Sequence, residues 1–391
     1  MGVEQFASDT WDVVVVGAGP AGASAARAAA AAGCRVLLLE RAAIPRYKTC
    51  GGGLIGCSQH HLPEGLPLTV RDEIDAVTFG LRGRRERTMR SAGRCKMVFR
   101  DELDAALTRA AASAGALVAD RTPVLAVEDG HGTVTVRTAA GARVRARVLV
   151  GADGSASRIG RHVGVRCEQV DLALEVEVPV GPRTADRWRG RMLMEWGPLP
   201  GSFGWVFPKG DICTAGVVAA KGRGEDTKSY LREFLRRHGL DERVPVHDTG
   251  HLTRCRRPDS PLARGRVLLA GDAAGLCDPW SREGISFALR SGAWAGEAAA
   301  RMVRAHDEAE LRRARGAYTA AVMTTLGAEM RASRRIMDLF TRRPGLVHTA
   351  LTSVPPVWQR LDSYLAGTAT IPDVLGTRPA RAALAVAGLL P

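Results

Sequence analysis

A run of four valines that leads into a glycine loop constrains the fold of this chain more than any other stretch. Val13–Val16 is followed by Gly17-x-Gly19-x-x-Gly22 and then by alanine-rich sequence as far as Ala32. Four consecutive β-branched residues predict a strand buried on both faces, as in the centre of a parallel sheet, and alanine is the strongest helix former. The sequence therefore predicts a strand, a tight turn and a helix in immediate succession.

The glycines of this loop have the spacing of a dinucleotide-binding fingerprint. Gly17 permits a tight turn, Gly19 lets the backbone approach a pyrophosphate, and Gly22 allows the helix to pack closely on the strand. The helix N-terminus then faces the negative charge of the phosphates. A second predicted strand, Arg35–Leu39, ends at Glu40, whose carboxylate can accept hydrogen bonds from both ribose hydroxyls. We expect the chain to bind an adenine dinucleotide.

Composition is that of a soluble globular enzyme: 391 residues, 46% hydrophobic and 25% charged, which predicts two or three domains. The first twelve residues hold three acids and no base, so they lack the pattern of a secretory signal. No apolar run approaches the roughly 18 residues that span a bilayer. We therefore expect a cytoplasmic protein whose eight cysteines are thiols. Because no CxxC pair is present, we expect no metal site.

The net charge of +14 raises the question of a nucleic-acid partner. Arg and Lys are scattered through every segment, and clusters such as Arg82–Arg90 and Arg254–Arg257 have no interleaved aromatic residues to stack on bases. We expect no nucleic-acid partner. Attraction to anionic lipid heads or to a diphosphate substrate remains open.

Two later apolar strands also end in turns that combine glycine with an acid: Val148–Val150 before Asp153-Gly154, and Val267–Leu269 before Gly271-Asp272. A helix is predicted from Ile285 to about Arg304. Between the two turns, strands of alternating pattern predict an inserted antiparallel sheet. The expected organisation is a discontinuous nucleotide-binding domain of residues 1–165 and 261–307, a substrate domain of residues 166–260, and a mostly helical region of residues 308–391.

These three glycine-and-acid turns resemble the FAD-binding fingerprints of the p-hydroxybenzoate hydroxylase superfamily of flavoproteins, over residues 12 to about 300. The resemblance implies an α/β fold, with a Rossmann-like FAD-binding domain of the GR2 type, an inserted antiparallel substrate sheet and a helical C-terminal region. It also implies FAD as the cofactor. No second nucleotide fingerprint for NADPH is present, so the sequence does not identify the external reductant.

By this resemblance Glu40 holds the adenosine ribose, Arg100 lies along the phosphate and ribityl region, and Val124 touches the adenine through its backbone. Asp272 binds the ribityl or pyrophosphate part, and the helix that begins near Gly284 points its N-terminus at the isoalloxazine. A partial positive charge there stabilises an anionic reduced flavin. The expected FAD-binding residues are Gly17, Gly19, Pro20, Ala21, Gly22, Glu40, Arg41, Lys48, Cys50, Gly51, Gly52, Arg100, Val124, Asp153, Gly271, Asp272, Pro279, Gly284 and Ile285.

Two further stretches resemble one branch of that superfamily, the geranylgeranyl reductases. Pro45-Arg46-x-Lys48-x-Cys50-Gly51-Gly52 is similar to their Pro-Arg-x-Lys-x-Cys-Gly-Gly segment, and Phe203–Pro208 to their Tyr-x-Trp-x-Phe-Pro motif. Phe203 replaces the tyrosine, and Asp278–Gly284 departs from the usual Asn-Pro-x-Thr-Gly-Glu-Gly. The resemblance implies reduction of carbon–carbon double bonds in a prenyl chain, such as a geranylgeranyl or menaquinone-like chain.

Reduction of an unactivated double bond needs a hydride on one carbon and a proton on its neighbour, in a site that excludes water. An apolar tunnel over the flavin is therefore expected, and its lining is expected to include Phe203, Trp205, Phe207, Trp196 and Met194. Trp205 and Cys50 are the expected catalytic residues. Cys50 is either a proton donor or a small residue fitted beneath the ring, and for each aromatic the alternative is core packing.

The first alternative function is an aromatic monooxygenase or halogenase that acts through a flavin C4a adduct. Halogenases carry a Trp-x-Trp-x-Ile-Pro stretch, of which Phe203–Pro208 keeps the second tryptophan and the proline. The second alternative is a redox-silent flavin-binding protein.

The C-terminal region carries a stripe of apolar residues interleaved with arginines. Two interpretations are open: a helix that contacts a membrane surface, consistent with a prenyl-lipid substrate, or a helix packed on the body with a solvated basic face. The residues concerned are Met323, Leu326, Met330, Met337, Phe340, Arg331, Arg334, Arg335, Arg342 and Arg343.

Overall fold

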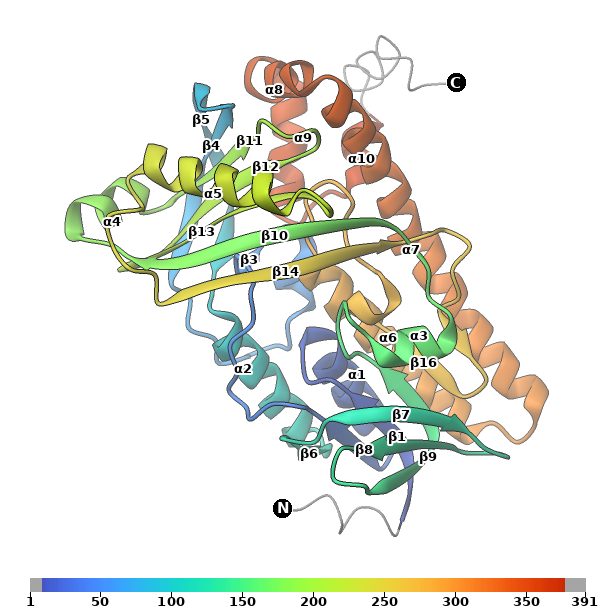
Figure 1. The fold of residues 1–391 in the computed structure, drawn as a ribbon. Coiled ribbons are helices and arrows are strands. Elements are labelled where there is room, and N and C mark those ends of the chain that lie inside the picture. Colours follow the sequence, from blue (N-terminus) through green and yellow to red (C-terminus); the bar gives the residue numbers. More distant parts are fainter. Residues whose placement is uncertain (1–8, 377–391) are drawn as a thin grey trace.

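The computed structural model describes residues 9–376 and contains two sheets, of which the lower one in Figure 1 carries the valine strand at its centre. Val13–Val16 is buried and pairs in parallel on both sides, with Val36–Leu39 and Val148–Gly151. The predicted central strand is therefore confirmed. In spatial order the strands are β15 (Ala263–Arg264), β16 (Val267–Leu269), β9 (Arg143–Gly151), β1 (Thr10–Val16), β2 (Val36–Leu39) and β6 (Leu117–Ala119), with the hairpin β7 (Val124–Asp129) and β8 (Val134–Thr138) attached to β9.

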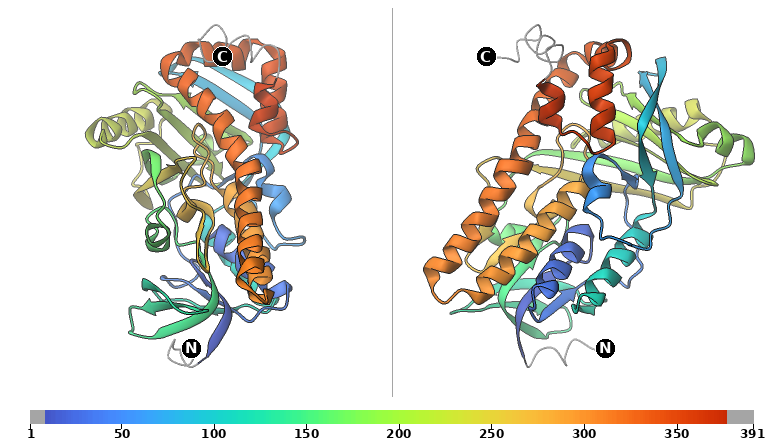
Figure 2. Two further views of the ribbon diagram at one scale, coloured as in Figure 1. Left: turned by 90° about the vertical axis from the view of Figure 1, so that its right-hand side faces the viewer. Right: turned by 180° about the vertical axis from the view of Figure 1, so that it is seen from behind.

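Helix α1 (Pro20–Ala31) lies against α6 (Ile285–Arg304) at a distance that only glycine permits. A Cβ on Gly292 would lie 2.1 Å from the carbonyl oxygen of Ala21, so the two backbones touch. In the right-hand view of Figure 2 the helices α7 (Glu308–Arg342), α6, α1 and α2 (Arg100–Ser113) stand side by side. Both helices of the central pair begin on the same side of the molecule, at the glycine loop and at Gly284.

The second sheet is larger than the sequence predicts. Residues 53–97, expected in the nucleotide-binding domain, form three of its strands. One of them, β4 (Asp72–Leu81), pairs in parallel with β11 (Arg191–Trp196), so the sheet is mixed rather than purely antiparallel. The proposed domain boundaries thus do not coincide with the strand pairing. In spatial order the strands are β14 (His247–Arg256), β10 (Cys167–Pro179), β13 (Ile212–Ala220), β12 (Phe203–Lys209), β11 (Arg191–Trp196), β4 (Asp72–Leu81), β5 (Arg84–Met97) and β3 (Gly53–Leu54).

The two faces of this sheet have different neighbours. Helix α5 (Gly224–His238) packs Tyr230 and Phe234 on one face. The other face carries Trp205 and Phe207 and turns toward the C-terminal helices and the first sheet. Smaller elements complete the chain: α3 (Arg158–Val163), α4 (Pro182–Trp188), and the short 3₁₀ turns Gly56–His61 and Gly271–Ala274.

The C-terminal region is helical as far as the structure describes it, and residues 377–391 lie outside the described part. Helix α7 (Glu308–Arg342), orange in Figure 2, runs along both sheets and is followed by α8 (Pro344–Ser353), α9 (Pro355–Leu365) and α10 (Ile371–Leu375). Within residues 9–376, no helix is both long and apolar enough to cross a membrane.

The apolar stripe of α7 packs into the body of the protein, as the second interpretation of this region expects. Leu326, Met330 and Phe340 are buried, and Met323 and Met337 pack against the same clusters. The arginines on the outer side are exposed, except that Arg334 pairs with Glu168 at 2.6 Å. The stripe itself is therefore a packing surface.

Replacement of Gly292 by alanine is expected to destabilise the protein by about 1–3 kcal/mol, because the new methyl group would overlap the α1 backbone. Gly316→Ala is the matched control, since its Cβ meets no atom within 4 Å on the exposed side of α7, and it should stabilise by about 0.5–1 kcal/mol. Urea unfolding followed by circular dichroism measures both. An unchanged midpoint for Gly292→Ala would contradict the close helix contact.

Candidate active site

A cavity of about 520 Å³ is bounded by the two sheets and by the N-terminal ends of α1 and α6. One part of its wall comes from the glycine loop, Glu40 and the segment 41–53, and the opposite part comes from β10 and β12. A cavity of this size, with mostly apolar walls and a few convergent charged groups, is typical of a cofactor or ligand site.

The glycine loop forms the nucleotide end of the cavity. Gly17 has a φ of +100°, and its Cβ would lie 2.3 Å from the carbonyl oxygen of Ala152, so the turn packs directly on the end of β9. A Cβ on Gly22 would lie 1.7 Å from the carbonyl oxygen of Gly17. Gly19 differs, because its Cβ would meet only the guanidinium of Arg46, at 3.7 Å. The loop thus offers bare backbone and a helix N-terminus to the cavity, which fits a pyrophosphate.

Glu40 and two arginines lie beside this loop. The Ala18 N–H donates to Glu40 Oε2 at 2.8 Å, and Arg46 Nε lies 3.3 Å from Glu40 Oε1. Arg46 also reaches Asp104 at 3.1 Å, and Arg100 donates to both oxygens of Asp104 at 3.0 Å. One carboxylate, Asp104, therefore orients two guanidinium groups toward the place where phosphates would bind.

Asp272 and the start of α6 form the middle of the cavity. Burial opposes ionisation of Asp272, but His251, Lys48 and Arg100 outweigh it and hold the pKa of this carboxyl below its ordinary value. The carboxylate lies close to Gly284, the N-cap of α6, whose Cβ would be 3.3 Å from Asp272 Oδ1. An ionised acceptor and a helix N-terminus thus face the same space.

Aromatic side chains of β12 form the apolar wall. Phe203, Trp205 and Phe207 line the cavity, and a Cβ on Gly51 would lie 2.8 Å from the Phe207 ring and 3.3 Å from Trp205 Nε1. The Trp205 N–H is buried and has no hydrogen-bond partner among the described residues. Met194, on the neighbouring strand, lines the same wall.

Charged side chains lie deep beside this wall. Glu175 on β10 accepts a hydrogen bond from the Cys50 N–H at 2.8 Å. Lys209 is buried, lies 3.9 Å from Glu177 and 4.5 Å from the centre of the Phe99 ring, and its Nζ donates no hydrogen bond to any described residue. Burial lowers the pKa of Lys209 and, together with Arg100, that of Lys48.

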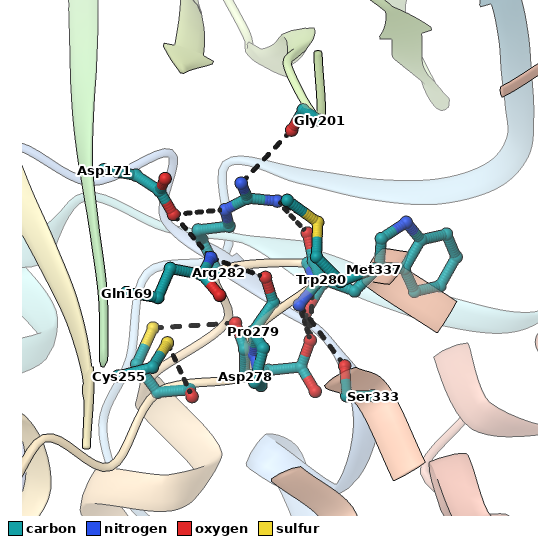
Figure 3. A network of polar contacts seen from close by, with 12 residues as sticks. Gln169, Asp171, Gly201, Cys255, Asp278, Pro279, Trp280, Arg282, Ser333 and Met337 are labelled. Carbon is teal, nitrogen blue, oxygen red and sulfur yellow. Dashed lines mark hydrogen bonds and ion pairs between the residues drawn. The ribbon is translucent and has the colours of Figure 1, made fainter. Parts of the chain in front are cut away.

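Arg282 occupies the stretch that departs from the geranylgeranyl reductase pattern, at the position where that pattern has glycine. Its φ of +57° is a conformation that favours glycine, which accounts for the pattern and makes an arginine there strained. Figure 3 shows what holds it: the guanidinium donates to Asp171 Oδ2 at 3.0 Å, to the Trp280 carbonyl at 2.6 Å and to the Gly201 carbonyl at 3.2 Å. Arg282 also lies over the Phe203 ring, 5.4 Å from its centre, and lines the cavity.

Most of the expected residues line this one cavity, but some lie behind its wall. Trp196 is packed against Phe79, Trp280 and Phe340 in the core, so the prediction that it lines the tunnel is wrong. Its ring lies edge-on to that of Phe340 in α7, with 5.0 Å between the ring centres. Gly22, Gly271 and Pro279 also lie outside the lining. The residues that do line it are Gly17, Gly19, Pro20, Ala21, Glu40, Arg41, Lys48, Cys50, Gly51, Gly52, Arg100, Val124, Asp153, Asp272, Gly284, Ile285, Phe203, Trp205 and Phe207.

Asp153 lines the cavity, yet its carboxylate is already engaged. It accepts hydrogen bonds from the Arg158 N–H at 2.7 Å and from the Ser157 hydroxyl, so it caps α3. Sequence reasoning missed Arg46, His251 and Glu175 as site residues. Arg46 stands inside the quoted Pro-Arg-x-Lys motif, whereas no local pattern marks the other two.

Outside this cavity, three potential metal ligands lie close together among the described residues. Glu86, Glu195 and His238 have ligand atoms within 4.8 Å of one another. Arg237 donates to both oxygens of Glu195, at 2.7 and 2.8 Å, so a guanidinium already neutralises the buried carboxylate. We interpret this cluster as an ion-pair network between β11 and α5.

The cavity fits FAD on three structural grounds. Bare backbone at Gly19 can approach a pyrophosphate, an ionised Asp272 can accept hydrogen bonds from hydroxyls, and the start of α6 faces an apolar aromatic wall where a flavin ring can lie.

Comparisons with known proteins agree with this geometry. The model of the FAD binding domain family matches residues 10–314. A digeranylgeranylglycerophospholipid reductase of Methanocella arvoryzae is 30% identical over 357 residues, which is 85% of this chain and 88% of the relative. A geranylgeranyl diphosphate reductase of Rhodobacter capsulatus is 30% identical over 348 residues, 84% of each chain.

Solved structures show the same fold. A geranylgeranyl bacteriochlorophyll reductase-like protein from Thermoplasma acidophilum has a TM-score of 0.78 at 23% identity, covering 98% of this chain and 100% of its own. A flavin-dependent brominase has a TM-score of 0.73 at 21% identity, covering 92% of this chain and 94% of its own. Reductases and halogenases thus share this architecture, and the structural likeness alone does not separate them.

The purified protein is expected to be yellow and to release FAD on denaturation. Glu40→Ala and Asp272→Ala should each weaken FAD retention about tenfold or more, because each removes a charged hydrogen-bond acceptor from the cavity. Glu297→Ala, an exposed carboxylate on α6, is the matched control. Absorbance of the released flavin per mole of protein measures the effect. A colourless preparation that takes up no added FAD would contradict the cofactor assignment.

Proposed function

This chain belongs to the FAD binding domain family and, within it, to the geranylgeranyl reductases, and from that membership we propose that it reduces carbon–carbon double bonds of a prenyl chain with electrons from reduced FAD. The observation that carries the proposal is the aromatic wall of β12. Trp205 and Phe207 pack on the glycine segment that follows Cys50, across the cavity from the start of α6.

The residues of this wall explain how the protein would assist the reaction. Reduced FAD supplies a hydride, and an unactivated double bond offers no polar group through which a catalyst could draw electrons. Positioning of the chain and exclusion of water must therefore lower the barrier. Phe203, Trp205 and Phe207 can hold an alkyl chain against the flavin-facing segment, and the position of Phe203 on the Arg282 guanidinium keeps that ring in place.

Cys50 belongs to the same proposal, and two roles are considered for it: proton donation and close packing. Glu175 accepts a hydrogen bond from the backbone N–H of Cys50. Burial lowers the pKa of Arg100, but Asp104 and, to a smaller extent, the Cys50 side chain raise it above its ordinary value. The thiol therefore lies within electrostatic range of the phosphate-binding arginine.

The first test is an assay with prenyl lipids and dithionite-reduced FAD, analysed by mass spectrometry. Products should gain two hydrogens for each reduced double bond. Trp205→Ala should lose roughly 100-fold in turnover and keep its FAD, because it removes the wall that positions the alkene. Oxygenated or halogenated aromatic products from a parallel assay, with no reduced lipid, would instead support the monooxygenase or halogenase alternative.

We also propose that the protein is cytoplasmic and meets its substrate at a membrane surface. A prenyl chain of about C20 has a large apolar area, worth about 25 cal/mol per Å², and stays in a bilayer unless an apolar groove replaces the lipid. Exposed arginines at the C-terminal end of α7, including Arg331, Arg335 and Arg342, are available to anionic headgroups.

Sedimentation with anionic vesicles at low and high salt tests this contact. Pelleting should be strong at low salt, weak at high salt, and lost when Arg331, Arg335, Arg342 and Arg343 are changed to glutamine. Neutral vesicles are the control. If the wild type fails to pellet at low salt, the membrane proposal is wrong, while the reduction assay in detergent still tests the chemistry.

A further inference from the structure

Glu175 is a buried acid at the substrate end of the cavity that no motif of the sequence identifies. It lies on β10, in one row across the second sheet with Gly216 of β13 and Trp205 of β12. A Cβ on Gly216 would lie 2.3 Å from the Trp205 ring, so the indole extends over this glycine toward Glu175. The carboxyl group is thus beside the aromatic wall, and it lines the cavity.

One oxygen of Glu175 is available for chemistry. Oε1 accepts the hydrogen bond from the Cys50 N–H, whereas Oε2 has no hydrogen-bond partner among the described residues. Glu283, another buried carboxyl that lines the cavity, is different: Ser286 donates to both of its oxygens, from the backbone at 2.7 Å and from the hydroxyl at 2.6 Å. Glu283 is therefore a cap of α6, and of these two acids Glu175 is the one with a free oxygen.

The surroundings of Glu175 bring its pKa close to neutral, so the acid form prevails below about pH 7. Burial raises the pKa of this carboxyl to about 7, although Lys209, the Cys50 N–H and Lys48 act in the opposite direction; Glu177, on the same strand, raises it further. The charge of Glu175 also acts on Tyr47, and the directly paired neighbours, Gly216 and Thr249, have no titratable side chain. A buried acid with a pKa near the working pH is suited to proton donation.

We propose that Glu175, rather than Cys50, is the proton donor of the alkene reduction, an inference that rests on the proposed function. The double bond takes a hydride from reduced FAD on one carbon and the Glu175 proton on its neighbour. The π bond is lost, two C–H bonds form, FAD becomes oxidised, and Glu175 is left as a carboxylate that regains its proton from solvent. Nearby Lys48 and Lys209 stabilise that carboxylate by their charge.

Glu175→Gln tests the proposal, because an amide of the same shape cannot donate this proton. Turnover should fall about 100-fold or more while FAD content stays at the wild-type level. The wild-type rate should be highest below pH 7, where the acid form prevails, and should fall as pH rises through about 7. In Glu175→Gln this fall should disappear.

Two carboxyl variants serve as controls. Glu177 lies outside the cavity lining, so Glu177→Gln should keep the wild-type rate at low pH. The fall in rate should move to lower pH, because the Glu177 carboxylate raises the pKa of Glu175. Glu283→Gln removes a carboxyl whose pKa burial also raises to about 7, and it should retain the fall at high pH. A fall that vanishes in Glu283→Gln and persists in Glu175→Gln would overturn the assignment.

Infrared spectroscopy of the FAD-loaded protein gives a readout that needs no turnover. The carbonyl stretch of a protonated carboxyl should be present below pH 7, titrate away above it, and be reduced in Glu175→Gln. If the wild type reduces prenyl lipids but this band or the high-pH fall is unchanged in Glu175→Gln, the proton-donor proposal fails and the proposed function stands. If the wild type reduces none, both proposals fail, whatever the infrared band shows.

Discussion

The contact between the backbones of α1 and α6 is the constraint on which the cavity depends. Gly292 and Gly296 bring α6 so close that added Cβ atoms would lie 2.1 and 2.2 Å from carbonyl oxygens of α1. Helix α1 begins at the glycine loop and α6 begins at Gly284, so this contact sets the distance between two helix N-termini. Because each N-terminus carries a partial positive charge, one elongated anionic cofactor can be held by both.

The second sheet supplies what the helices lack, an apolar wall with buried charges behind it. Alternation along the strands places Trp205 and Phe207 of β12 on the same face as Glu175 of β10. The low polarity of this face has two effects. The aromatic rings exclude water from the alkyl chain, and burial raises the pKa of the Glu175 carboxyl. An ionised acid is kept elsewhere in the same cavity, at Asp272, where three basic groups outweigh burial.

Much of this architecture could be predicted from local sequence patterns. The valine strand, glycine loop and alanine helix are confirmed, as are the family and the cofactor, because these features depend on neighbours within about thirty residues. The Cys50 segment and the β12 motif lie on one cavity as expected. The roles of their residues stay predictions, since position in a wall does not establish chemistry.

The parallel core, the dinucleotide turn and the family of the chain could thus be predicted without a structure, since each follows from short-range spacing and hydrophobic runs. Three features became visible only in the folded chain: residues 53–97 join the second sheet, Trp196 faces the C-terminal helices, and Glu175 meets Cys50 across a separation of 125 residues. Arg282 shows the same limit: its strained backbone is held by Asp171 and Gly201, which are distant in the sequence. Burial and charge at such positions come from chain segments that only folding brings together, so no local pattern could have contained them.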